Sequence, residues 1–138
     1  MSHYTQLEVD FTDGECLKKA LIQMGFKEDQ IEVYNTAQNL YGYRGDTRAQ
    51  KAHIIIRRKH VGQASNDLGF ERLASGKYVA HVSEYDAHKY DSAWFGKLKQ
   101  AYTVEKTAKG ILKSNTGWKI FQKIKKEDGT VQMILTRN

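Results

Sequence analysis

The alternation of apolar and polar residues divides the chain into candidate strands and helices. Residues 3–11 alternate with period two, which predicts a half-buried strand. Residues 12–24 combine a capping pattern, in which Thr12 is the expected N-cap, with apolar side chains on one helical stripe, so they predict an amphipathic helix. Three consecutive isoleucines at 54–56 predict a strand that is covered on both faces.

The central stretch, residues 67–86, contains two apolar runs on either side of a polar turn and predicts a hairpin at the centre of the sheet. Residues 30–34 and 39–43 predict two short strands or one strand that continues after a bend. A helix is expected from Ser92, with an interruption at Thr103. Two alternating runs around Asp128-Gly129 predict a second hairpin over residues 118–137. This order predicts an α+β fold, in which two or three helices pack on one face of a mostly antiparallel sheet.

The length of 138 residues fits a single domain. The single cysteine excludes an internal disulfide and a zinc site built from several cysteines. No apolar run approaches the roughly 18 residues that a membrane span needs, and the first residues lack the features of a signal peptide. We therefore expect a protein that is not secreted and that works in the cytoplasm or in the organelle where it is made.

The positive charge lies in the second part of the chain. Residues 1–86 hold 11 Lys and Arg against 12 Asp and Glu, whereas residues 87–138 hold 11 against 4, within a total net charge of +6. Such a basic half favours an anionic partner, either nucleic acid or an acidic protein. A solvated lysine surface explains the same excess.

The C-terminal hairpin carries the clearest candidate surface for such a partner. At period two, Lys119, Lys123 and Lys125 share one strand face with Phe121 between them. Lysines around an aromatic ring on an open sheet suit single-stranded nucleic acid, although lysines also protect edge strands from aggregation. The predicted anion-binding residues are Arg57, Arg58, Lys119, Phe121, Lys123, Lys125 and Lys126.

An enzyme site at the central hairpin is the alternative. His81 occupies alternate strand positions with Tyr85, and Asp86 follows, so a base and a carboxylate could meet at one strand end. His3, next to the first strand, is the other candidate base. The more ordinary interpretation is a structural or surface histidine. None of the histidines follows a metal-binding motif, so no metal and no cofactor are expected.

Several short motifs resemble one protein family. They are Met1-Ser2-His3-Tyr4-Thr5, Gly42-Tyr43-Arg44-Gly45, Asn66-Asp67-Leu68-Gly69-Phe70, Ser75-Gly76-Lys77, Tyr85-Asp86 and the segment from Tyr102 to Ala108. The chain is similar in these motifs to a family of unknown function from cyanobacteria, red-algal plastids (conserved plastid reading frame thirty-five) and some bacteriophages. The resemblance covers residues 1–115 as a family-like core, and the hairpin of residues 116–138 fits it less clearly. It implies hosts, and the plastid stroma as a location for an organelle-encoded member, but no activity.

Together these patterns favour a non-catalytic binding or adaptor module over an enzyme. Homo-oligomerisation through sheet edges stays open.

Overall fold

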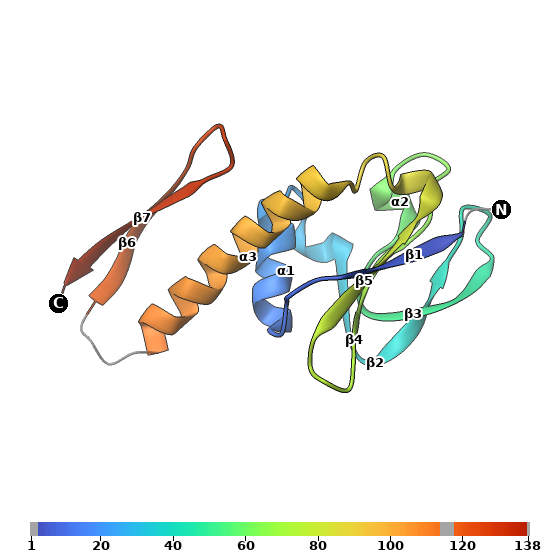
Figure 1. Ribbon diagram of the computed structural model, residues 1–138, viewed down its shortest axis with the longest axis horizontal. Coiled ribbons are helices and arrows are strands. Elements are labelled where there is room, and N and C mark those ends of the chain that lie inside the picture. Colours follow the sequence, from blue (N-terminus) through green and yellow to red (C-terminus); the bar gives the residue numbers. More distant parts are fainter. Residues whose placement is uncertain (1–2, 114–117, 138) are drawn as a thin grey trace.

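The computed structural model describes residues 3–113 and 118–137, with the backbone alone described at 118, 119, 121 and 137. A five-stranded sheet has the order β1-β5-β4-β3-β2, and each neighbouring pair is antiparallel (Figure 1). Its strands are β1 (Tyr4–Glu8), β2 (Ile31–Tyr41), β3 (Thr47–Ile56), β4 (Leu68–Arg72) and β5 (Tyr78–Ser83). The hairpin expected at the centre of the sheet is β4–β5, and β4 is the middle strand, as predicted.

Two long helices, α1 (Gly14–Gln23) and α3 (Ser92–Lys113), cover one face of the sheet. They bury a single large core, in which the helix side chains Leu17 and Leu98 lie with Ile54, Phe70 and Ala80 from the sheet. The connections contain the short helix α2 (Arg58–Val61) and two 3-10 turns, η1 (Glu28–Gln30) and η2 (Glu84–Asp86). The molecule is therefore an α+β domain with a mostly antiparallel sheet, as the pattern predicted.

Two local expectations about the helices were wrong. Asp13, not Thr12, caps α1, because its Oδ1 accepts a hydrogen bond from the Cys16 N–H at 3.1 Å. The helix that begins at Ser92 runs unbroken to Lys113. Thr103 does not interrupt it, because the Thr103 hydroxyl donates to the Lys99 carbonyl at 2.8 Å and is satisfied within the helix.

The sheet curls so that the far end of β2 comes over β4. The register of β2 against β3 shifts between Val33 and Gln38, and beyond that shift Leu40 and Ala52 lie over Gly69 of β4. A Cβ atom on Gly69 would lie only 2.6 Å from the Ala52 Cβ, so glycine permits this close approach. The curl brings Tyr41, the last residue of β2, to the segment that leads into β4.

The C-terminal hairpin forms a separate two-stranded sheet, β6 (Trp118–Lys125) with β7 (Val131–Arg137). Figure 1 shows α3 lying between this hairpin and the five-stranded sheet. Strands β6 and β7 both contact α3. The hairpin predicted from the Asp-Gly turn is therefore present, but it is not part of the main sheet.

Candidate functional site

The lysines of the C-terminal hairpin do not form the face that their spacing predicted. The β6–β7 register shifts between Ile120 and Gln122, so Lys119 pairs with Thr136 whereas Lys123 pairs with Met133. The bulge adds one residue to β6 and reverses the alternation of faces along the strand. The backbone position of Lys119 therefore belongs to the opposite face of the hairpin from those of Lys123 and Lys125. The prediction of one shared face was therefore wrong. The side chains of Lys119 and Phe121 lie outside the described residues.

The other two lysines of that set point toward the body of the protein. The Lys123 ammonium lies 3.1 Å from Glu105 Oε1 on α3, and the Lys125 ammonium donates to the Gln23 carbonyl of α1 at 3.4 Å. Lys126 lies in the exposed hairpin turn. The lysines that were expected to bind a partner thus include two that attach the hairpin to the helices.

The predicted enzyme site is not assembled either. His81 is buried and its Nε2 lies 2.8 Å from Glu71 Oε1. Asp86 instead accepts from the Ser83 hydroxyl at 2.7 Å, while Tyr85 is half exposed and meets only the edge of the His88 ring. His3 is exposed, and its carbonyl accepts from the Glu84 N–H. Within residues 3–113 and 118–137, no hydrogen bond joins these side chains into one constellation.

The remaining two predicted residues, Arg57 and Arg58, do line a pocket. It lies where β2 and β3 end and α2 begins, and has a volume of about 320 Å³. We call it the arginine pocket; its lining residues are Tyr41, Gly45, Arg57, Arg58, Lys59 and Asp67.

A buried carboxylate, Asp67, organises the arginine pocket. Its side chain is 1% exposed and accepts three hydrogen bonds, from the Tyr41 N–H (2.7 Å), the Arg57 guanidinium (2.8 Å) and the Arg58 N–H (2.7 Å). The Tyr4 hydroxyl donates to the Asp67 carbonyl at 2.7 Å. Burial, reinforced by the Asp67 charge, raises the pKa of Tyr4, so its hydroxyl stays protonated and remains a donor. Asp67 thereby joins the start of β1 to the ends of β2 and β3 and to α2.

The neighbouring Asn66 fixes the turn between β2 and β3. Its Oδ1 accepts from the Tyr43 N–H at 2.9 Å, and its Nδ2 donates to the Ser83 hydroxyl at 2.9 Å. Its own N–H donates to Asp86 Oδ2 at 3.0 Å. The turn contains Gly45 at φ +79°, a left-handed conformation that favours glycine. The Asn66-Asp67 motif therefore holds both the last residue of β2 and the turn that follows it.

Arg57 is a fixed wall of the pocket rather than a free cation. It donates to Asp67, to Glu32 Oε1 at 3.0 Å and to the Asn39 carbonyl at 3.3 Å, and it lies over the Tyr41 ring at 5.1 Å from the centroid. Burial alone would lower the Arg57 pKa, but hydrogen bonds to Asp67, Tyr34 and Glu32 outweigh that effect and raise it. Arg57 thus stays charged while its guanidinium is neutralised by two carboxylates.

Arg58 and Lys59 are different, because their charges are not compensated. The Arg58 guanidinium donates to the Tyr43 carbonyl at 3.0 Å, and both side chains are exposed at the pocket. In the part of the chain that the structure describes, neither cation lies within 4.0 Å of a carboxylate. The arginine pocket therefore places two cations without carboxylate partners beside a buried, hydrogen-bonded network, which gives this surface a local positive charge.

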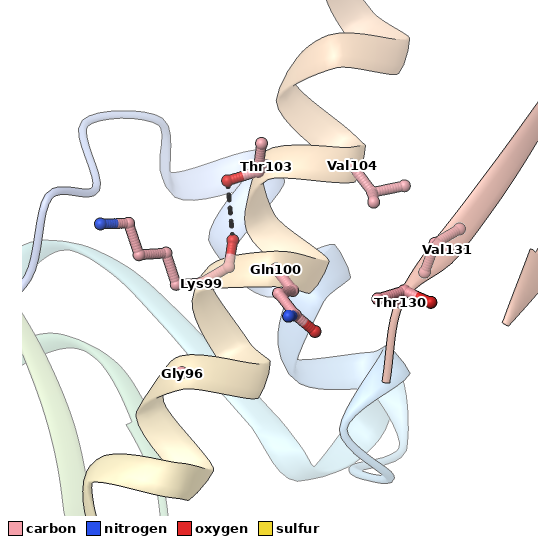
Figure 2. Close-up of a pocket in the computed structure, with 7 residues that line it drawn as sticks. All are labelled: Gly96, Lys99, Gln100, Thr103, Val104, Thr130 and Val131. Carbon is pink, nitrogen blue, oxygen red and sulfur yellow. Dashed lines mark hydrogen bonds between the residues drawn. The ribbon is translucent and has the colours of Figure 1, made fainter. Parts of the chain in front are cut away.

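Two other hollows lie between α3 and the hairpin, but their chemistry is less specific. Figure 2 shows the first, of about 390 Å³, where Val104 and Val131 point toward one another and Lys99, the one charged lining residue, extends away. The second, of about 430 Å³, is lined by four lysines, and three of them, Lys19, Lys109 and Lys123, are paired with carboxylates. Neither hollow combines unpaired cations with buried polar groups as the arginine pocket does.

No metal-binding cluster of three or more His, Cys, Asp or Glu occurs among the described residues. No helix in the described part of the chain is both long enough and apolar enough to cross a membrane. Cys16 is buried, and this burial raises the pKa of its thiol, so it stays protonated at neutral pH.

Sequence reasoning grouped Arg57 and Arg58 with the hairpin lysines as one anion-binding set. The structure instead places them in a pocket with Tyr41, Gly45 and Asp67, which the sequence did not single out as binding residues. The arginines were visible because they end a β-branched run abruptly. Asp67 bonds with residues 10 and 26 positions away in the chain, and no local pattern carries such a pairing.

Comparison with known proteins agrees with the motif resemblance. The family model described as "Protein of unknown function (DUF1257)" matches residues 20–134, well over half of the 138 residues, and extends past residue 115 through β6 and into β7. The "Uncharacterized protein ycf35" of Cyanophora paradoxa is 27% identical over 141 residues, which cover 99% of this chain and 98% of that protein. No solved structure matches the chain significantly. The chain therefore belongs to the family of proteins of unknown function DUF1257.

Proposed function

We propose that this protein is a non-catalytic binding module that captures an anionic group of its partner in the arginine pocket. The observation that carries the proposal is the pair of uncompensated cations, Arg58 and Lys59, on a base fixed by the buried Asp67. Because Asp67 holds the Arg58 backbone and the Tyr41 backbone, the pocket is formed before a ligand arrives, which lowers the entropy cost of binding. The cytoplasm or a plastid stroma is the location that we propose for it.

The proposal moves the binding surface away from the hairpin. Lys123 and Lys125 are engaged with the helices, so they are poorly placed to hold a partner. A catalytic role for His81, Tyr85 and Asp86 is not proposed, because each side chain has its own separate environment.

Salt-dependent binding of polyanions tests the proposal. The probes are a labelled oligothymidylate and a polyglutamate, followed by fluorescence anisotropy over a salt series. Each phosphate contact on a single strand contributes about −0.7 to the slope of log K against log salt. We therefore expect Arg58→Ala and Lys59→Ala each to weaken binding and to make the slope shallower by about 0.7.

Lys126→Ala is the matched control, since it removes one exposed positive charge from the hairpin turn and leaves the pocket intact. It should leave both affinity and slope almost unchanged. The proposal is wrong if Lys126→Ala weakens binding as much as Arg58→Ala does, or if neither polyanion binds with any salt dependence.

A further inference from the structure

We propose that the ligand of the arginine pocket is a nucleotide unit of a single-stranded nucleic acid, with its phosphate on Arg58 and Lys59 and its base stacked on Tyr41. This inference rests on the proposed function and adds the chemical class of the ligand. It starts from the Tyr41 ring, which lines the pocket and is nevertheless 40% exposed. Other large apolar side chains, such as Tyr85, are also exposed, and what distinguishes Tyr41 is its place in a pocket beside the cations Arg58 and Lys59.

The Tyr41 ring is held as a fixed platform. Its backbone N–H donates to Asp67 Oδ2 at 2.7 Å and its carbonyl accepts from the Asp67 N–H at 3.0 Å. The Arg57 guanidinium lies over the ring, 5.1 Å from its centroid, and is itself held by Asp67 and Glu32. The ring therefore has a cation on one side and pocket space beside it. Flat aromatic surfaces next to phosphate-binding cations are the combination that single-stranded nucleic acids recognise.

A second pair of the same kind stands next to the pocket. The Arg44 guanidinium lies 5.2 Å from the centroid of the Tyr43 ring, two residues from Tyr41. The end of β2 and the turn after it thus carry two tyrosines with arginines over them, and the Arg58 guanidinium donates to the Tyr43 carbonyl of the same turn. The volume of about 320 Å³ is at the small end of the range for ligand sites, which suits one nucleotide inserted from a flexible strand rather than a duplex.

An acidic peptide is the competing ligand that these observations disfavour. Its carboxylates would engage Arg58 and Lys59 equally well, but they would make no stacking contact with the exposed Tyr41 ring. The contribution of the base to binding affinity therefore distinguishes a nucleic acid from an acidic peptide.

The test compares an oligothymidylate with an abasic oligonucleotide of the same length and phosphate number, each followed by fluorescence anisotropy with the full chain. We expect the abasic strand to bind at least about fivefold more weakly, since each stacked base contributes about 1–3 kcal/mol. Tyr41→Leu should weaken binding of the oligothymidylate by a similar factor and leave the affinity for the abasic strand unchanged. Tyr41→Phe keeps the aromatic face and should bind like the original chain. A urea unfolding curve for each variant confirms that its fold is retained.

The outcomes distinguish this inference from the function on which it rests. If the abasic strand binds as tightly as the oligothymidylate while Arg58→Ala still weakens both, the base contact is wrong and the anion pocket stands. If polyglutamate displaces the oligothymidylate at equal charge concentration, an acidic protein replaces nucleic acid as the partner. If Arg58→Ala changes nothing, the proposed function itself fails.

Discussion

At the scale of single residues, Asp67 has the greatest structural influence on the proposed site. Its carboxylate and backbone join Tyr4 of β1, Tyr41 of β2, and Arg57 and Arg58 at the start of α2, which are three separate segments. A charge that is 1% exposed is tolerated because the carboxylate accepts hydrogen bonds from Tyr41, Arg57 and Arg58. The proposed binding residues at the surface thus depend on a buried residue for their positions.

Asp67→Asn is expected to destabilise the fold strongly. The amide keeps the size of the side chain but leaves Arg57 without its buried counter-charge, and breaking such a pair costs about 3–5 kcal/mol. We expect about 3 kcal/mol, the lower end of that range, because Glu32 continues to pair with Arg57. Urea unfolding measures the loss, with the exposed Asp29→Asn as a control within about 0.5 kcal/mol of the original chain. A loss below about 1 kcal/mol for Asp67→Asn would contradict the role of Asp67.

At the scale of elements, the periodic spacing of apolar residues and the residue types in the turns predicted most strands and both long helices. Buried Ile54 to Ile56 and the Asp128-Gly129 turn appear where their patterns placed them. Two of the wrong predictions, the shared lysine face and the break at Thr103, have a common cause. In each, a local feature of the backbone or of its hydrogen bonds leaves no mark on the pattern of apolar and polar residues. A bulge near Phe121 inverts the phase of β6, and a back-bonded hydroxyl lets Thr103 stay in a helix.

The contact between α1 and α3 should make stability depend on acidic pH. Burial of Asp13 opposes its charged form, but hydrogen bonds from Lys109, at 2.6 Å, and from the Cys16 N–H outweigh this and lower its pKa from 3.8 to about 2. Because the folded state holds the lower pKa, the contribution of Asp13 is full above pH 3.8 and is lost as the pH falls toward 2.

Asp13→Asn tests this contact, since asparagine also caps helices but carries no charge. The substitution should cost about 1 kcal/mol near neutral pH, a value reduced by solvent screening, and its cost should shrink as the pH approaches about 2. Unfolding free energies over a pH series give the comparison. If Asp13→Asn costs nothing at any pH, the Asp13 charge contributes nothing to stability and Asp13 acts through the cap alone.

At the scale of the whole molecule, the distribution of Lys and Arg along the chain does not reveal which of these cations lack a carboxylate partner in the fold. The second part of the chain carries the excess of Lys and Arg, yet Lys109, Lys123 and Lys125 are used to hold α3, α1 and the hairpin together. The first part is nearly neutral, yet it exposes Arg58 and Lys59 without counter-charges. The fold class was predictable from the sequence because it depends on local periodicity. The site was not, because it depends on the curl of β2 over β4 and on pairings across the chain.

The most direct test of the account is to map, by NMR, which backbone amides shift when an oligothymidylate is titrated into the full chain. The account predicts that the shifts are concentrated in residues 41–46 and 57–61, around the arginine pocket, and that strands β6 and β7 change little. Shifts concentrated on β6 and β7 would contradict it and return the binding surface to the hairpin lysines.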